Sequence, residues 1–289
     1  MEKKTILVTG GAGFIGSNLI EELVRNPSNK VVCLDNYFTG KKENHIAGAT
    51  YLEGHTKDVG EHVSVRPDLV YHLGEYARVE QSFDDVERVF EYNTVGTIAV
   101  LEFCRKHGAK IVYAGSSTKF GDGGLGINQS PYAWTKAANS ELVKNYGTWF
   151  GVPYAITYFY NVYGPREIAE GNYATVIAAF AKRHRDGKPL PVTSPGTQVR
   201  NFTHVKDIVR GLQLVAEKGE GDEYGLGALK GYSILEIAKL FGGEIEMLPP
   251  RQGTRMNSSL DTASAEALGW RAEHDVADYV KEIVAGRVS

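Results

Sequence analysis

Cysteine is scarce in this sequence of 289 residues, and the two that occur, Cys33 and Cys104, lie in unrelated segments. Neither has the spacing to His, Cys or carboxylate neighbours that metal ligands show, so we expect no disulfide framework and no metal site. A reducing cytoplasm fits this usage.

Long apolar runs and a large excess of one charge are missing as well. No run approaches the roughly 20 residues that cross a bilayer, and the opening residues lead directly into a strand and a glycine loop. We therefore expect no membrane anchor and no export signal. The formal net charge of −3 gives no reason to expect nucleic acid or an anionic membrane as a partner.

The first half of the chain alternates short β-rich runs with helical patterns. Strands are predicted at 4–10, 30–36, 49–54, 67–74, 109–115 and 152–160, and helices at 14–26, 84–107 and 131–150. The strand runs are continuously apolar instead of alternating, which is typical of a parallel sheet covered on both faces. This rhythm predicts an α/β fold with a Rossmann-type, doubly wound parallel sheet.

The second half is less regular and has Pro- and Gly-rich links. Helices are predicted near 173–187, 205–218, 233–241, 262–268 and 275–286, with a strand near 222–227. We expect residues 1–163 to form a dinucleotide-binding domain, to which about 203–227 returns. Residues 164–289 are then expected to form a smaller substrate-binding lobe.

A glycine-rich turn stands between the first predicted strand and the first predicted helix. Gly11, Gly13 and Gly16 form G-x-G-x-x-G, which lets backbone amides approach a pyrophosphate at the helix N-terminus. Asp35 ends the second strand about 20 residues later, where a carboxylate can accept both ribose hydroxyls and repel a 2′-phosphate. Together, the glycine turn and Asp35 favour NAD over NADP. The alternative is that Asp35 is a surface residue that ends a strand and binds no cofactor.

A tyrosine and a lysine lie one helical turn apart near the middle of the chain. Ser130 and Pro131 are typical of an N-cap and first helical position, so Tyr132 and Lys136 share one face. A phenol has a pKa of about 10, and an ammonium about 6 Å away at an effective dielectric of about 20 lowers such a value by about two units. Such pairs also arise by chance; beside a dinucleotide loop, an acid–base role is favoured, with Ser116 at the end of its strand bonding the reacting oxygen.

These motifs occur together in a known order. TGGAGFIG, Asp35, YHLG, YNTVGT, SSTKFG, SPYAWTK, YNVYGP and QVRNFTHVKDI resemble the extended short-chain dehydrogenase/reductases, in the branch of NAD-dependent nucleotide-sugar epimerases and dehydratases. The resemblance covers nearly the whole chain. It implies NAD in a Rossmann domain, a nucleoside-diphosphate sugar in the C-terminal lobe, oxidation at the sugar 4-position, and a homodimer built from helices 84–107 and 131–150, where Val86, Val89 and Phe90 are apolar.

Residue roles follow from the same resemblance. It implies that Ser116, Tyr132 and Lys136 are catalytic, and that Asn93 supports the lysine through water. The implied cofactor-binding residues are Gly10, Gly13, Phe14, Ile15, Gly16, Asp35, Asn36, Leu73, Asn93, Tyr132 and Lys136. The implied substrate-binding residues are Thr118, Asn161, Arg200 and Arg251, in which the two arginines suit a diphosphate.

Departures from the family pattern reduce the number of reactions that the chain is expected to catalyse. Ser117 and Thr118 stand where 4,6-dehydratases of this branch carry adjacent acids, and neither hydroxyl is an acid or base at neutral pH. This favours a 4-epimerase over a dehydratase and leaves a 4-dehydrogenase that releases the keto sugar as an alternative. A sensor or scaffold that binds NAD without catalysis is the non-enzymatic alternative. Lys119 could pair with Glu75 or with a substrate acid, or be solvated, and His204 is expected only to pack or cap beside Asp207.

Overall fold

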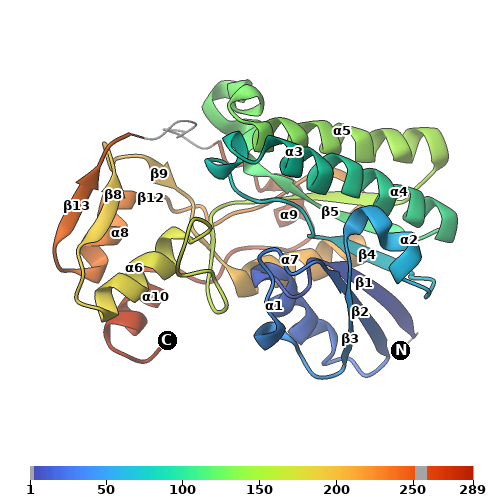
Figure 1. Cartoon of the computed structure of the whole chain (residues 1–289), viewed down its shortest axis with the longest axis horizontal. Coiled ribbons are helices and arrows are strands. Elements are labelled where there is room, and N and C mark those ends of the chain that lie inside the picture. The colour runs from blue at the N-terminus through green and yellow to red at the C-terminus, as the bar shows by residue number, and fades with distance from the viewer. Residues whose placement is uncertain (1–2, 251–258, 289) are drawn as a thin grey trace.

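A seven-stranded parallel sheet forms the centre of the larger part of the molecule (Figure 1). The computed structural model describes residues 3–250 and 259–288, with the backbone alone for 121–125. In the strand order β11-β6-β5-β4-β1-β2-β3, every neighbouring pair is parallel. The strands are β1 (Lys4–Thr9), β2 (Asn29–Asp35), β3 (Ala49–Glu53), β4 (Leu69–His72), β5 (Lys110–Ser116), β6 (Tyr154–Phe159) and β11 (Gly221–Leu226).

Helices cover both faces of this sheet, which confirms the predicted doubly wound fold. α1 (Phe14–Leu23) and α7 (Val205–Lys218) pack together on one face, and α4 (Gly96–His107) and α5 (Pro131–Phe150) cover the other (Figure 1). Ile6, Leu7 and Val8 are therefore all buried, as the continuous apolar runs predicted. The chain order reverses between β1 and β4, and ligands of such sheets bind at this switch point beyond the carboxyl ends of the strands.

The helix predicted for 84–107 is interrupted by a wider turn. α3 (Val86–Val89) leads into a π-helical stretch, η4 (Phe90–Val95), before α4 begins. The wider turn accompanies a buried Asn93, whose Oδ1 accepts the Tyr76 amide at 2.7 Å. Such turns occur often at functional sites, and the one here joins the helix to the loop after β4.

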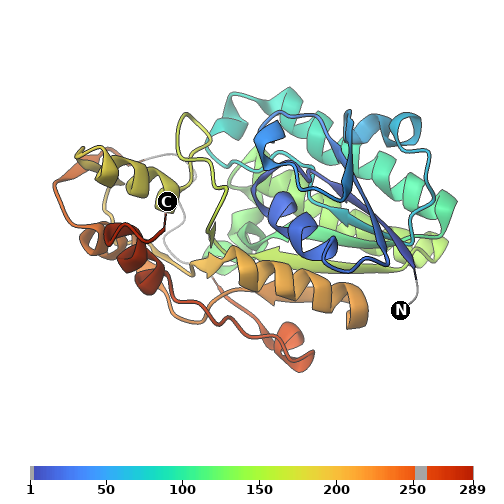
Figure 2. The same cartoon turned by 90° about the horizontal axis from the view of Figure 1, so that it is seen from below.

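A smaller lobe lies to one side of the sheet and has its own core (Figures 1 and 2). Its helices are α6 (Val176–Arg185), α8 (Ile234–Phe241) and α10 (Val276–Val284). β8 (Leu190–Thr193) pairs with β13 (Ile245–Leu248), and β9 (Val199–Arg200) with β12 (Tyr232–Ser233). These strands were not predicted from the sequence, because each is short and pairs with a partner distant along the chain.

The chain returns to the main sheet after entering the smaller lobe. β7 (Val162–Tyr163) pairs with β10 (Thr203–His204), α7 follows, and β11 adds the edge strand beside β6. α9 (Ala263–Ala267) also contacts β11, and the buried Trp270 donates its Nε1–H to the Asp207 carbonyl at 2.8 Å. The division of the chain at residue 163 stays a prediction.

The remaining elements are short. They are η1 (Lys42–Asn44), η2 (Thr56–Asp58), α2 (Val59–His62), η3 (Gln81–Phe83) and η5 (Ser117–Asn128). Over residues 3–250 and 259–288, no helix combines the length and apolar character that a bilayer crossing requires. Within the same ranges, His, Cys and carboxylate side chains form no group of three that could hold a metal ion.

Candidate active site

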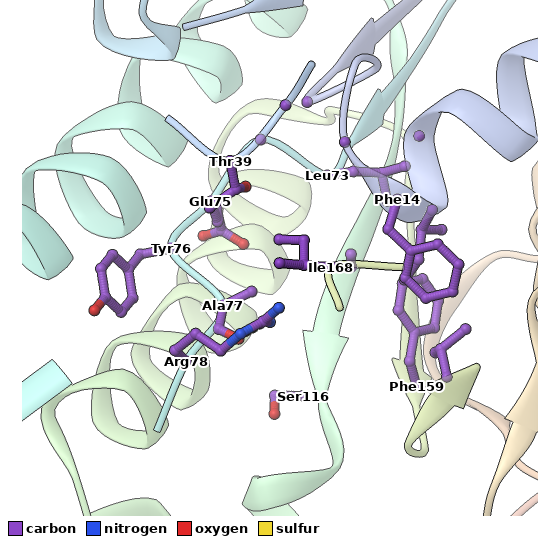
Figure 3. A pocket seen from close by; sticks show the side chains of 18 of the residues that line it. Phe14, Thr39, Leu73, Glu75, Tyr76, Ala77, Arg78, Ser116, Phe159 and Ile168 are labelled. Carbon is purple, nitrogen blue, oxygen red and sulfur yellow. Dashed lines mark hydrogen bonds between the residues drawn. The ribbon is translucent and has the colours of Figure 1, made fainter. Parts of the chain in front are cut away.

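A cavity of about 480 Å³ lies at the carboxyl ends of the central strands. Figure 3 shows Phe14 and Phe159 on one side of it and Glu75, Tyr76 and Arg78 on the other. Most of the residues expected from the sequence line this cavity: Gly10, Gly13, Phe14, Ile15, Gly16, Asp35, Asn36, Leu73, Ser116, Thr118, Tyr132, Lys136 and Asn161. A second cavity of about 810 Å³ adjoins it, shares Asn161 with it and includes Arg200. Arg251 lies outside the described residues.

Gly10, Gly13 and Gly16 line the cavity at the start of α1. A Cβ on Gly16 would overlap the Gly10 carbonyl, and Gly10 itself has φ of +70°, a conformation that favours glycine. α1 starts after Gly13 without a side-chain cap, so its first amides have no side-chain acceptor within the helix start. This cradle fits the pyrophosphate of a dinucleotide.

Asp35 is held rigidly at the end of β2. Its carboxylate accepts the Ala12 amide at 2.9 Å and the Tyr37 amide at 2.8 Å. Burial raises the pKa of Asp35, and the two amide bonds oppose that change. The side chain lines the same cavity as the glycine turn, and a carboxylate at the end of the second strand is suited to accept ribose hydroxyls.

The start of α5 places the tyrosine and the lysine as the sequence predicted. Ser130 accepts the Ala133 amide at 3.1 Å and Pro131 opens the helix. Tyr132 and Lys136 then both reach the cavity from one helix face. Ser116 ends β5 beside them; its Oγ accepts the Thr118 hydroxyl at 2.9 Å and keeps its own hydrogen to donate.

Lys136 has a partner that the sequence reading did not assign to it. Its ammonium donates to the Ala114 carbonyl and pairs with the Glu75 carboxylate, and the two side chains are only 6% and 4% exposed. Asn93 bonds the Tyr76 backbone and the Thr135 hydroxyl, and its expected support of the lysine through water stays a prediction. The sequence offered one sign of the role of Glu75: it is a carboxylate that directly follows the buried strand predicted at 67–74.

The expected pairing of Lys119 with Glu75 is wrong. Its ammonium lies 3.1 Å from the Tyr158 hydroxyl and 3.4 Å from Asp222, at the β6–β11 edge of the sheet, and its side chain is 24% exposed. The expectation for His204 is confirmed, because its Nδ1 accepts the Lys206 amide and caps α7.

Two further charged residues line the cavity and were missed. Arg78 donates to the Tyr173 carbonyl through Nε at 3.0 Å. Glu167 accepts the Gly164 amide at 2.8 Å, and burial raises its pKa to about 7. Both come from irregular segments, where no periodic pattern indicates which side chains point inward.

A neutral histidine lies behind the site. His72 bonds the Thr9 hydroxyl at 2.7 Å and the Thr97 hydroxyl at 3.0 Å, and burial lowers its pKa to about 4. An unfolded histidine has a pKa of about 6.5, so the unfolded chain binds the extra proton first as pH falls. Stability attributable to His72 is therefore full above pH of about 6.5 and declines toward pH 4.

This linkage predicts a smaller acid sensitivity in His72→Asn. Between pH 7 and 5 the wild-type free energy of unfolding should fall by about 2 kcal/mol more than that of the variant. Urea unfolding at both pH values measures the two losses. The same substitution at the exposed His62 should leave the loss unchanged. Equal losses in wild type and His72→Asn would contradict the assignment.

Known proteins match nearly the whole chain. The model of the NAD dependent epimerase/dehydratase family matches residues 6–227. A putative UDP-glucose 4-epimerase of Methanocaldococcus jannaschii is 32% identical over 298 residues, 96% of this chain and 97% of the relative. UDP-glucuronic acid decarboxylase 6 of Arabidopsis thaliana is 31% identical over 290 residues, 92% of this chain and 83% of the relative.

A solved structure agrees with these relatives. The complex of Thermus thermophilus UDP-glucose 4-epimerase with NAD superposes with a TM-score of 0.89 at 30% identity, covering 97% of this chain and 98% of that one.

Proposed function

The chain belongs to the NAD dependent epimerase/dehydratase family, and from this premise we propose that it is an NAD-dependent nucleotide-sugar 4-epimerase. The observation that carries the proposal is the meeting of Ser116, Tyr132 and Lys136 in one cavity with the glycine cradle and Asp35. Neighbouring proteins named as UDP-sugar 4-epimerases support both the reaction and a uridine diphosphate as the carrier.

Three residues of the cavity then have defined roles in the reaction. Tyr132 takes the proton of the sugar 4-hydroxyl, Ser116 donates a hydrogen bond to the same oxygen, and Lys136 holds positive charge beside the phenol. Bound NAD supplies the reversible hydride acceptor. Once the keto sugar has rotated in the cavity, the hydride would return to the other face of carbon 4, and Tyr132 gives its proton back to the 4-oxygen, so the hydroxyl has the opposite configuration.

The sugar nucleotide is proposed to extend from this cavity into the second one. Asn161 borders both cavities, and Arg200 borders the second, where a guanidinium can bind paired phosphate oxygens. We keep Arg251 as a further proposed phosphate ligand on the resemblance alone.

Dehydration is the second candidate reaction, because Glu167 is an acid within the cavity that the sequence reading missed. Ser117 and Thr118, next to the catalytic serine, remain without acid–base capacity at neutral pH. The other carboxylates of the cavity are already engaged, since Asp35 accepts two backbone amides and Glu75 pairs with Lys136. Glu167 alone does not supply the separate acid and base that removal of water needs, so epimerisation stays the favoured reaction.

Product analysis separates these reactions. Purified protein with NAD is incubated with UDP-, GDP-, dTDP- and CDP-sugars, and the products are followed by NMR. We expect interconversion of a UDP-sugar with its 4-epimer and no net NADH. A 4-keto-6-deoxy sugar would replace the proposal with dehydration, net NADH would replace it with dehydrogenation, and no turnover of any sugar would contradict it.

Asp35→Ala should change the choice of cofactor. Loss of two charge-assisted bonds to the ribose is expected to weaken NAD binding by about 10- to 100-fold, while NADP binding weakens less because a repulsive charge is gone. Titration calorimetry with both dinucleotides gives the ratio. Glu53→Ala, at the exposed end of the adjacent strand, is the matched control. An unchanged NAD/NADP ratio in Asp35→Ala would contradict the role of Asp35.

We also propose a homodimer through the helices that cover the upper face in Figure 1. Large exposed apolar side chains gather there: Val86, Phe90, Val95, Ile98, Trp134, Trp149 and Phe150. Phe90 stacks on Trp134 with ring centroids 5.5 Å apart. Val89, in contrast, is fully buried and belongs to the core of the protomer.

The dimer proposal predicts a concentration-dependent assembly. Sedimentation velocity at micromolar concentration should give a dimer, and Ile98→Glu should give a monomer with the circular dichroism of the folded wild type, because a charge within an apolar interface is desolvated without a partner. A wild-type protein that stays monomeric would overturn this.

A further inference from the structure

Glu75 is a fully hydrogen-bonded carboxylate in the wall of the cavity. Its Oε1 accepts from the Thr97 hydroxyl at 2.9 Å, the Tyr113 hydroxyl at 3.1 Å and the Asn139 amide at 2.9 Å. Its Oε2 pairs with Lys136. Four donors converge on this buried group, which matches the acceptor capacity of an ionised carboxylate. A protonated carboxyl group would leave one of the four donors without an acceptor.

The network behind Glu75 has one consistent direction. The single hydroxyl hydrogen of Thr97 is used on Glu75, so Thr97 accepts from Nε2–H of His72, and Nδ1 of His72 accepts from Thr9. This places the neutral histidine in one tautomer, as assigned from the bonds of its neighbours. Thr9 in turn accepts the Gly74 amide at 3.0 Å, so the chain of bonds starts and ends in the segment that carries Glu75.

These bonds determine how many N–H donors of Lys136 are left for a ligand in the cavity. An ammonium has three N–H donors, and Ala114 and Glu75 take two of them. One donor is left for a molecule in the cavity. Asn139, one turn beyond Lys136 on α5, bonds Glu75 as well, so the carboxylate ties the helix to the end of β4.

We propose that Glu75 is a positioning residue of the reaction: it fixes the ammonium of Lys136 and offsets its charge, and so sets the pH at which Tyr132 can act as a base. The inference rests on the proposed function for the role of Tyr132, and on the buried pair itself for the role of Glu75.

The surrounding charges do not replace that of Glu75. His72 on β4 is neutral, and burial raises the pKa of Tyr113 on β5 well above its usual value, so neither carries charge near neutrality. Arg78, in the loop after β4, lines the same cavity as Tyr132 and Glu167 and interacts electrostatically with both, so Glu167 partly offsets its charge. Glu75 is thus the carboxylate in direct contact with the lysine among the described residues.

Glu75→Gln tests the charge with little change of shape. Without the carboxylate, the full field of the ammonium stabilises the phenolate, so half-maximal kcat/KM should move to lower pH by about one unit. Glu75→Asp keeps the charge on a shorter side chain, so its midpoint should stay near that of wild type while kcat falls. Glu91→Gln, which removes an exposed partner of Lys57, should change neither.

A second readout needs neither cofactor nor substrate. Tyrosinate absorbance is titrated with pH in the protein without NAD. The difference between wild type and Tyr132→Phe isolates the signal of Tyr132, and the difference between Glu75→Gln and the double variant isolates it again without the carboxylate. This signal should appear at lower pH in the second comparison. A shift here without any sugar turnover would support Glu75 while the proposed function fails.

The inference would be overturned if Glu75→Gln is folded, as judged by circular dichroism, and has the same midpoints as wild type in both the pH profile and the tyrosinate titration. If Glu75→Gln fails to fold, Glu75→Asp decides: a midpoint moved by a full unit despite the retained charge would overturn it equally.

Discussion

Tyr132→Phe is expected to lower kcat for epimerisation about a thousandfold and to leave NAD binding within a few-fold of wild type. The substitution removes one oxygen, and with it the only proposed acceptor of the sugar proton; general-base groups contribute about 10²- to 10⁴-fold. The aromatic ring and the start of α5 are kept, since Ser130 and Pro131 define that helix end. Initial rates by NMR and binding of NAD by calorimetry give the two numbers.

Tyr92→Phe is the matched control. Tyr92 also lines the cavity, where its ring meets His55 edge-on, but it has no proposed part in proton transfer. Its kcat should stay within threefold of wild type. If Tyr92→Phe and Tyr132→Phe lose activity equally, the loss reflects the shape of the cavity, and the assignment of the base is wrong.

Lys136→Met should damage both activity and folding. It leaves the carboxylate of Glu75 buried without its cation, and removing one partner of a buried ion pair costs about 3–5 kcal/mol. Activity should fall about as far as in Tyr132→Phe, because the phenol loses the adjacent positive charge. Urea unfolding and NMR rates measure the two effects.

A double variant separates the two effects. Lys136→Met with Glu75→Gln removes the unpaired charge, so most of the lost stability should return while activity does not. Lys144→Met, two turns further along α5, breaks an exposed pair with Glu141 of 2.9 Å and should cost about 1 kcal/mol or less. Equal losses at Lys136 and Lys144, or no recovery in the double variant, would contradict a buried pair.

The parts of the site that depend on local pattern could be predicted from the sequence. Gly13 and Gly16, Asp35, and the tyrosine and lysine of α5 all follow strands or caps whose ends the sequence marks clearly. Their meeting follows from parallel topology, because the carboxyl ends of parallel strands lie at one edge.

The parts that depend on tertiary packing could not be predicted. Glu75 lies in an irregular segment, and its partners come from three other elements that are 22 to 64 residues distant. The π-helical turn at Asn93 could not be recognised, because the sequence on either side of it has the pattern of an ordinary helix. Arg78 and Glu167 likewise reach the cavity from loops, where side-chain direction has no period to reveal it.

The most direct test uses a UDP-sugar substrate that carries deuterium at the 4-position, incubated with the protein and NAD in ordinary water. Mass spectrometry and NMR of the product locate the label. We predict the 4-epimer with deuterium still on that carbon and no NADH at the end, because the cofactor returns the same atom that it accepts. Deuterium on carbon 6 or in released NADH, or its loss to water, would contradict the account.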